Sequence, residues 1–304
     1  MTGTAVAVLC ALAAAVFIAV GSVAQQTSAA AVPDSGDLVG SLLRSPRWWA
    51  GILGDGGSYI LQVIALTFGS VLLVQPLLVT SLLFALPIAA ATGGRRVDRS
   101  TWLLAGALCA ALAIFLLVGN PSEGRGDAAA ARWALPLGAV LAVAAAAVAL
   151  ALASPRLRAL AFGTAAGILY GVTSAFTKHV TDLAEHGIPQ LLGSWQTWTL
   201  VAAGAAAIYL QQRAFQAGSL TASLPALTVG EPLAAIVLGM TVLGEHLRTD
   251  SAGLLLVGAA VVVMLATTVL LSRQQAAATG DTTPGDDTVA TPAPAPPPET
   301  PRPR

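Results

Sequence analysis

The sequence predicts an all-α membrane protein with about nine transmembrane helices in two inverted repeats, followed by a disordered tail rich in proline. Hydrophobic residues make up 56% of the 304 positions and charged residues only 10%, too few charges to cover a soluble domain of this size. Apolar runs recur, and most reach the ~20 residues that a helix needs to cross the hydrocarbon core. The runs show no period-two alternation, so a transmembrane barrel is not supported.

Short polar connections such as residues 92–100 and 244–250 separate the predicted helices. The nine helices are expected at residues 3–24, 49–67, 70–91, 101–119, 134–153, 159–180, 191–213, 219–243 and 251–271. After Leu271 the composition changes to Pro, Thr, Ala and Asp, which cannot bury enough apolar surface to fold. Residues 273–304 are therefore predicted to be a disordered tail.

The first apolar run has two readings. Ser22-Val23-Ala24 before Gln25 resembles a signal-peptide cleavage site. However, no basic segment precedes the run, and the run is longer than the usual apolar core of a signal peptide. We therefore expect it to be retained as the first transmembrane helix, with cleavage as the alternative.

Lysine and arginine gather on one side of a nine-helix topology, and this side is expected to be cytoplasmic. The rich side holds Arg44, Arg47, Arg95, Arg96, Arg99, Arg156, Arg158, Arg213, Arg273, Arg302 and Arg304. The other side holds Arg125, Arg132, Lys178 and Arg248. This distribution predicts a multi-pass protein of the cytoplasmic membrane, with its N-terminus outside and its tail in the cytoplasm.

An internal repeat appears when the sequence is shifted by 149 positions. The informative matches are Gln62 with Gln211, Gly69-Ser70 with Gly218-Ser219, and Pro76 with Pro225. Five crossings separate the two copies, and because five is odd, the copies enter the membrane from opposite sides. We therefore expect a first repeat at residues 1–153 and a second at 154–272. Inverted repeats are the usual architecture of secondary transporters, which hold substrate between the halves.

Several segments carry a resemblance to a known family: WWAGILGDGGSY (48–59), VQPL (74–77), AGILYG (166–171), YLQQRAF (209–215) and LPALTVGEPLAAIVLGMTVLGEHL (224–247). The layout and these segments resemble the drug/metabolite transporter (DMT) superfamily, in particular its nine-helix NIPA-like and EamA-like branch. The resemblance implies a permease that works by alternating access. Where the NIPA branch tends to carry Gly-Glu and then Asn in its second helix, this chain has Gly54-Asp55 and then Ser58.

Glu231 is the strongest candidate for chemistry, because a charge in the middle of a membrane helix is costly and therefore invites explanation. Pro232 follows it directly, and Pro225 lies two turns earlier. Each proline removes a backbone donor and frees a carbonyl oxygen, and Pro76 is expected to break its own helix in the same way. We favour a role in proton or cation coupling, and the alternative is a neutral or paired carboxyl that packs two helices together.

A polar stripe in the second predicted helix places Asp55, Tyr59 and Gln62 on one face. Two readings are open for Asp55. It lines an ion or solute pathway, or it lies shallow and only caps or hydrates the start of the helix.

Three further polar residues complete the set of pathway candidates. Tyr209 and Gln211 lie in the seventh predicted helix, where an amide binds a polar solute or ties helices together. Lys178, near the end of the sixth, binds substrate or extends to the membrane surface.

Glycine and tryptophan predict packing and anchoring. Gly163, Gly167 and Gly171 recur every four residues and permit close helix packing, within the chain or across a homodimer. The tryptophans near helix ends are interpreted as interfacial anchors: Trp48, Trp49, Trp102, Trp133, Trp195 and Trp198.

The sequence lacks the motifs that are typical of several classes of function. The sequence has no phosphate loop, no catalytic triad or HExxH pattern and no cluster of its three histidines, and its net charge is zero. We therefore expect no enzyme activity, cofactor, bound metal or nucleic-acid partner.

The leading hypothesis is a secondary transporter that moves a small solute by alternating access, with proton or cation coupling through Glu231. The alternatives are a permease for magnesium or other divalent cations and a membrane scaffold that transports nothing.

Overall fold

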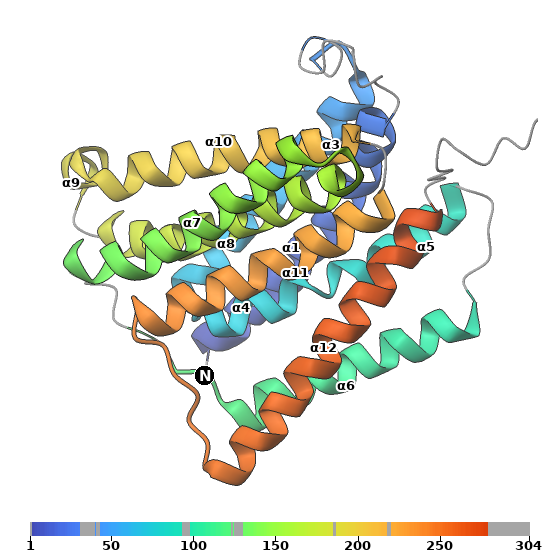
Figure 1. Cartoon of the computed structure of the whole chain (residues 1–304). Helices are drawn as coiled ribbons and strands as arrows, with labels where there is room; N and C mark the ends of the chain where they lie inside the picture. The colour runs from blue at the N-terminus through green and yellow to red at the C-terminus, as the bar shows by residue number, and fades with distance from the viewer. Residues whose placement is uncertain are drawn as a thin grey trace, which may run out of the picture.

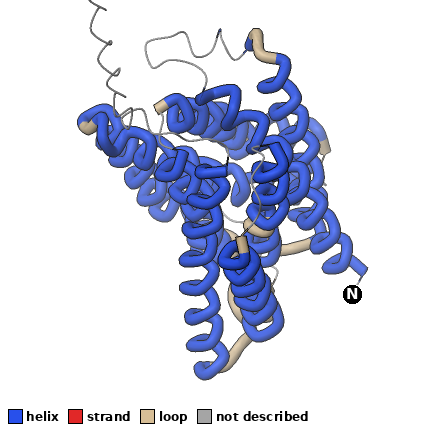
Figure 2. Tube along the Cα trace, turned by 90° about the vertical axis from the view of Figure 1, so that its right-hand side faces the viewer, coloured by secondary structure: helices blue, strands red, loops and turns tan. Residues whose placement is uncertain are grey.

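The computed structural model describes residues 2–30, 40, 43–92, 98–122, 124, 130–184, 187–217 and 220–278. Every regular element in this part of the chain is a helix, and the helices are joined by short connections (Figure 2). The Gly218-Ser219 pair and residues 279–304 of the predicted tail lie outside the described residues.

The elements are α1 (Thr2–Ala30), α3 (Pro46–Phe68), α4 (Val71–Leu78), α5 (Ser81–Thr92), α6 (Arg99–Gly119), α7 (Ala130–Ala153), the 3₁₀ turn η1 (Pro155–Leu157), α8 (Arg158–Ala184), α9 (Ile188–Gly193), α10 (Trp195–Gln216), α11 (Leu220–Thr241) and α12 (Ser251–Ala278). Among the described residues, seven helices are long and apolar enough to cross a membrane: α1, α3, α6, α7, α8, α11 and α12. The chain is thus a polytopic all-α membrane protein.

The third predicted helix is divided in two. Residues 70–91 form α4 and α5, separated at Val79 and Thr80. Here the N–H of Thr80 donates to the carbonyl oxygen of Leu77 (3.1 Å), a tighter turn than the α-helix. The Thr80 hydroxyl donates to the same oxygen (2.6 Å), and Pro76, which has no N–H, already removes the helical donor to the Leu72 carbonyl one turn earlier. Local chemistry therefore interrupts this helix in the middle of the bundle.

Two other boundaries differ from the prediction. The helix predicted at 191–213 is the short α9 followed by α10, which has the length of a span but carries several polar residues in its second half. Helix α12 runs on to Ala278, so residues 273–278 of the predicted tail are helical. The sequence Arg-Gln-Gln-Ala-Ala-Ala explains this extension, because all these residues are good helix formers.

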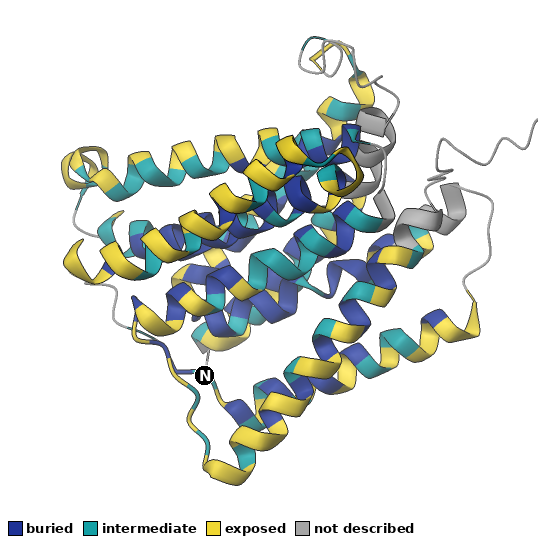
Figure 3. Ribbon diagram, viewed as in Figure 1, coloured by how far each residue is buried: buried dark blue, intermediate teal, exposed yellow. Residues whose placement is uncertain are grey.

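Helix α8 occupies the centre of the bundle. It packs against α11, α10 and α7 and also meets α3 (Figure 1). A larger share of α8 is buried than of any other candidate span, and the outer faces of α7 and α10 are exposed (Figure 3). The glycine strip of α8 faces α11: a Cβ at Gly163, Gly167 or Gly171 would lie within 2.6 Å of a backbone carbonyl oxygen of α11. The strip therefore packs helices within the chain.

One of the six predicted membrane anchors is a core residue. Trp133 is 1% exposed and stacks on Phe176 of α8, with ring centroids 4.2 Å apart. Trp195 and His179 meet its ring edge to face. The anchor interpretation is therefore wrong for Trp133, because the start of α7 lies against α8 rather than against lipid. By contrast, Trp102 is 66% exposed, as an anchor would be.

Candidate functional site

A small cavity lies inside the bundle between α1, α4, α5, α10 and α11. Its volume is about 70 Å³, which is room for a few water molecules or one ion. The lining residues are Ile18, Ala19, Gln75, Leu78, Val79, Ser81, Leu82, Ala85, Gln211, Phe215, Leu224, Leu227, Thr228, Glu231 and Pro232. Most of these are apolar, so the few polar groups that reach the cavity determine what it can bind.

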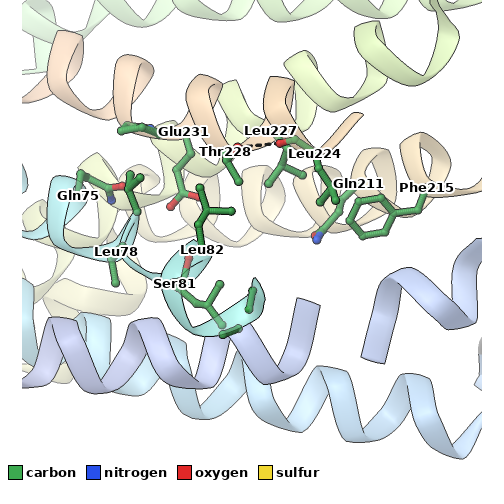
Figure 4. Close-up of a pocket in the computed structure, with 15 residues that line it drawn as sticks. Gln75, Leu78, Ser81, Leu82, Gln211, Phe215, Leu224, Leu227, Thr228 and Glu231 are labelled. Carbon is green, nitrogen blue, oxygen red and sulfur yellow. Dashed lines mark hydrogen bonds between the residues drawn. The ribbon is translucent and has the colours of Figure 1, made fainter. Parts of the chain in front are cut away.

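Glu231 supplies the carboxylate of the cavity. Its side chain extends from α11 toward the break between α4 and α5, where Leu82 and Ser81 lie (Figure 4). Pro232 lines the same cavity and, lacking an N–H, leaves the Thr228 carbonyl without its helical donor. A carboxylate beside a freed carbonyl oxygen is a ligand set suited to a proton or a hard cation.

Gln75 is the second polar group of the cavity, and it was not among the residues predicted to form a site. It lies in α4 directly before the buried Pro76 and is 1% exposed. Among the described residues, no group forms a hydrogen bond with its Nε2. A buried amide nitrogen without a partner is costly, so its place on the cavity wall points to a water or a solute oxygen that would accept its hydrogen bond. A lone glutamine within an apolar, proline-broken segment is the signal that could have revealed it.

Gln211, on α10, is also one of the residues that line the cavity. Its Oε1 accepts a hydrogen bond from the hydroxyl of Tyr170 on α8. The neighbouring Gln212 is also buried, at 4% exposed. Gln211 therefore joins the cavity wall to the central helix.

Two residues of the polar stripe of α3, Tyr59 and Gln62, contact α8 and do not line the cavity. The Gln62 amide donates to the Ser174 hydroxyl (3.0 Å). The Tyr59 hydroxyl lies 2.7 Å from that of Thr177. These contacts tie the two helices together across the bundle.

Asp55 lies within α3 and does not cap it. The N-cap is Ser45, whose hydroxyl accepts from the N–H of Trp48 (3.3 Å), so the capping interpretation of Asp55 is wrong. The Asp55 carboxylate faces α1, because a Cβ at Gly21 would lie 2.6 Å from its Oδ1. Asp55 is not among the residues that line the cavity of Glu231.

Lys178 and Tyr209 lie away from the cavity lining. Lys178 is 8% exposed, and its Nζ donates to the carbonyl oxygen of Leu66 (2.8 Å). It therefore does not extend to the membrane surface, but links the end of α8 to α3. Tyr209 is 52% exposed on α10. Of the predicted helix breakers, Pro232 lines the cavity and Pro225 faces the opposite side of α11.

A buried carboxylate outside the cavity, that of Glu245, joins two segments that lie far apart in the sequence. Glu245, 2% exposed, follows α11 and reaches the start of α4. Its two oxygens accept from the N–H groups of Val71 (2.7 Å) and Leu72 (2.8 Å). A negative side chain that accepts from the free N–H groups at the start of a helix is electrostatically favourable. Glu245 thus fixes the N-terminus of α4 to the α11–α12 connection.

Backbone contacts strengthen this junction. We call it the loop clasp, formed by residues 119–122 after α6 and 244–248 after α11. The N–H of Ser122 donates to the His246 carbonyl (2.9 Å), and the N–H of His246 donates to the Ser122 hydroxyl (3.0 Å). The N–H of Arg248 donates to the carbonyl of Gly119 (2.9 Å). The clasp closes one end of the bundle over the helix that carries Gln75.

Within the described residues, no three His, Cys, Asp or Glu side chains gather as a metal site would require. No family model matches the chain. No solved structure matches it. A protein of Corynebacterium glutamicum, described only as uncharacterized, is 37% identical over 254 residues, which cover 82% of this chain and 88% of that protein.

Proposed function

The chain belongs to the family of that uncharacterized Corynebacterium glutamicum protein, and we propose that it is a secondary transporter of the drug/metabolite superfamily. It moves a small solute across the cytoplasmic membrane by alternating access. The observation that carries the proposal is the interior cavity, whose wall holds both Glu231 and Gln75 beside a broken helix, with no partner for the Gln75 Nε2 among the described residues. Broken helices that present polar groups inside the membrane are a recurring feature of transporter sites.

The proposal includes nine crossings in two inverted repeats. In addition to the matches at an offset of 149, the packing in the two halves corresponds. Helix α1 packs against α3, α4 and α5, and α8 packs against the equivalent helices α10 and α11. The equivalent helices α6 and α12 pack against each other. Related packing in two halves supports an exchange of conformations between them.

Proton or cation coupling runs through Glu231. Carboxylates inside membrane helices are costly and commonly serve ion pathways. The cavity is too small for an organic solute, so in this conformation it holds the coupling ion or water, and the solute site forms when the halves separate. The clasp and Glu245 close one end of the bundle, as a closed gate would.

A proteoliposome uptake screen with Glu231→Gln tests this function. We expect the parent protein to take up at least one solute in response to a proton or cation gradient, and the variant to lose this dependence. Asp250→Asn is the matched control, because Asp250 is an exposed acid outside the cavity. Gradient-driven flux unchanged in Glu231→Gln would exclude the coupling role. No flux of any solute by the folded parent would favour a membrane scaffold.

A divalent-cation permease is the second candidate, and one observation favours it. Asp55 of α3 and Glu231 of α11 are both carboxylates within apolar helices of the bundle, so two negative groups would attract a cation to the interior. Calorimetric Mg²⁺ binding that is lost in Asp55→Asn and in Glu231→Gln would support this candidate. Mg²⁺ binding absent from the parent would exclude it.

The proposed topology places the N-terminus outside and the C-terminus in the cytoplasm. The arginines that follow α7 and the arginine near the end of α12, Arg273, support this orientation. Reporter fusions at residue 2 and after residue 278 test it, with activity expected from the cytoplasmic reporter only at the C-terminal site. Cytoplasmic activity at both sites would show that both termini are cytoplasmic and that the number of crossings is even, which would contradict nine crossings.

A further inference from the structure

A larger hollow lies on the outside of the bundle, on the face of α11 opposite the cavity. It has a volume of about 820 Å³ and runs between α7, α8, α11 and α12. Its lining residues are Val140, Val143, Leu160, Thr164, Ile168, Ala222, Pro225, Ala226, Val229, Gly230, Leu233, Ala234, Val237, Val269 and Arg273. Val143 is 57% exposed and Leu233 is 40% exposed, so the groove opens toward the surroundings of the bundle.

The groove has few polar side chains, and they differ in charge and in hydrogen bonding. Thr164 is already satisfied, because its hydroxyl donates to the Leu160 carbonyl (2.9 Å). Arg273 is the charged residue of the lining. The next residue, Gln274, turns toward α6 and accepts a hydrogen bond from Thr101 (2.7 Å). Arg273 therefore gives the otherwise apolar groove one positive charge, on its α12 wall.

Two more arginines lie close in sequence to the groove lining on α8. Arg158 begins α8 only two residues before Leu160, which lines the groove, and Arg156 is exposed in the preceding turn. Residues 130–168 and 251–278 contain no Asp or Glu. The helix ends around this opening therefore carry positive charge without a neighbouring acid on the same segments.

We propose that this groove binds one anionic phospholipid from the leaflet on the Arg273 side. The lining extends along α11 from Ala222 to Val237, about 22 Å at 1.5 Å per residue. This exceeds half of the roughly 30 Å hydrocarbon core, so an acyl chain fits along it. The headgroup phosphate meets Arg273 at the membrane surface, where arginines between helices attract anionic lipids. Lipid binding in this groove does not depend on whether the protein is a transporter.

Lipid retention by the purified protein tests the proposal. The delipidated full chain is mixed in detergent micelles with phosphatidylglycerol or phosphatidylcholine of identical acyl chains, and bound lipid is counted by native mass spectrometry. We expect phosphatidylglycerol to bind at least about fivefold more tightly, the effect of roughly one arginine near a lipid surface. Arg273→Gln should remove this preference. Arg248→Gln, an exposed arginine beyond α11, is the matched control and should retain it.

A groove-filling variant separates the groove from general charge attraction. Val143→Trp should weaken binding of both lipids, whereas Leu103→Trp, on the exposed outer face of α6, should not. Equal binding of the two lipids by the parent would overturn the proposal, as would an unchanged preference in Arg273→Gln. A dimer that excludes lipid and is dissociated by Val143→Trp would also overturn it, and would assign the groove to a second copy of the chain.

Discussion

Replacing Glu245 with alanine should destabilise the folded protein by several kcal/mol. Both carboxylate oxygens accept backbone N–H groups at the start of α4, and the residue is 2% exposed. Alanine leaves the N–H groups of Val71 and Leu72 buried without an acceptor, each at a cost of about 1–3 kcal/mol. The expected loss in the free energy of unfolding is therefore roughly 2–6 kcal/mol. Glu245→Gln keeps one acceptor oxygen, so its loss should be close to half as large.

The assay is unfolding in mixed micelles by added sodium dodecyl sulfate, followed by tryptophan fluorescence. Asp250→Ala is the control, because its carboxylate also caps a helix, accepting from Gly253 (2.8 Å), but on an exposed surface. An exposed cap contributes about 1 kcal/mol. Hydrogen exchange of the Val71 and Leu72 amides should rise in Glu245→Ala alone. Equal destabilisation by Glu245→Ala and Asp250→Ala would refute the reasoning from burial.

Three further predictions follow from packing and charge. Gly167→Ala should cost about 1–3 kcal/mol in the same titration, since its Cβ would lie 2.5 Å from the Leu227 carbonyl oxygen. Gly258→Ala, with no atom within 4 Å, should instead gain about 0.5–1 kcal/mol, and similar effects of both changes would contradict the packing argument. Trp133→Ala should cost about 3–5 kcal/mol, and a loss below that of Trp102→Ala would show that the stacked core position is not essential. The hydroxyl of Ser100 donates to Asp98 (2.8 Å) and holds the pKa of this carboxyl below its usual value. Any stability that Asp98 contributes is therefore present above the pKa of the unfolded state and lost as the pH falls through the lowered folded pKa. Ser100→Ala should raise the Asp98 pKa in a carboxyl NMR titration, and an unchanged value would argue against this hydrogen bond.

Residues that are expensive in lipid were predictable from the sequence. Glu231 and Gln211 stood out because polar groups inside apolar helices need a partner, and the structure places both on one cavity. The glycine strip of α8 was predictable because its period of four has a single structural use. In these cases a local pattern was enough to identify the residue.

Residues whose role depends on distant segments were missed or misread. Gln75 and Glu245 acquire their roles from α11 and α4, which lie more than 150 positions away in the sequence. Trp133 has the position of a membrane anchor but meets Phe176, which periodicity cannot reveal. The break at Val79 and Thr80 combines a proline with a threonine hydroxyl, and its position depends on both. Long-range pairing was the missing information in each case.

The burial of α8 has a consequence for how the protein is made. This helix leaves the ribosome after α3 and α7 but before α10 and α11, its main partners. Its buried lysine costs about 2.5–3.5 kcal/mol on insertion scales if it reaches the middle of the membrane alone. Helix α3 is already made at that point and offers the Leu66 carbonyl to Lys178 and the Gln62 amide to Ser174. During synthesis the polar face of α8 is therefore satisfied first, and its glycine face stays open to the bilayer until α11 arrives.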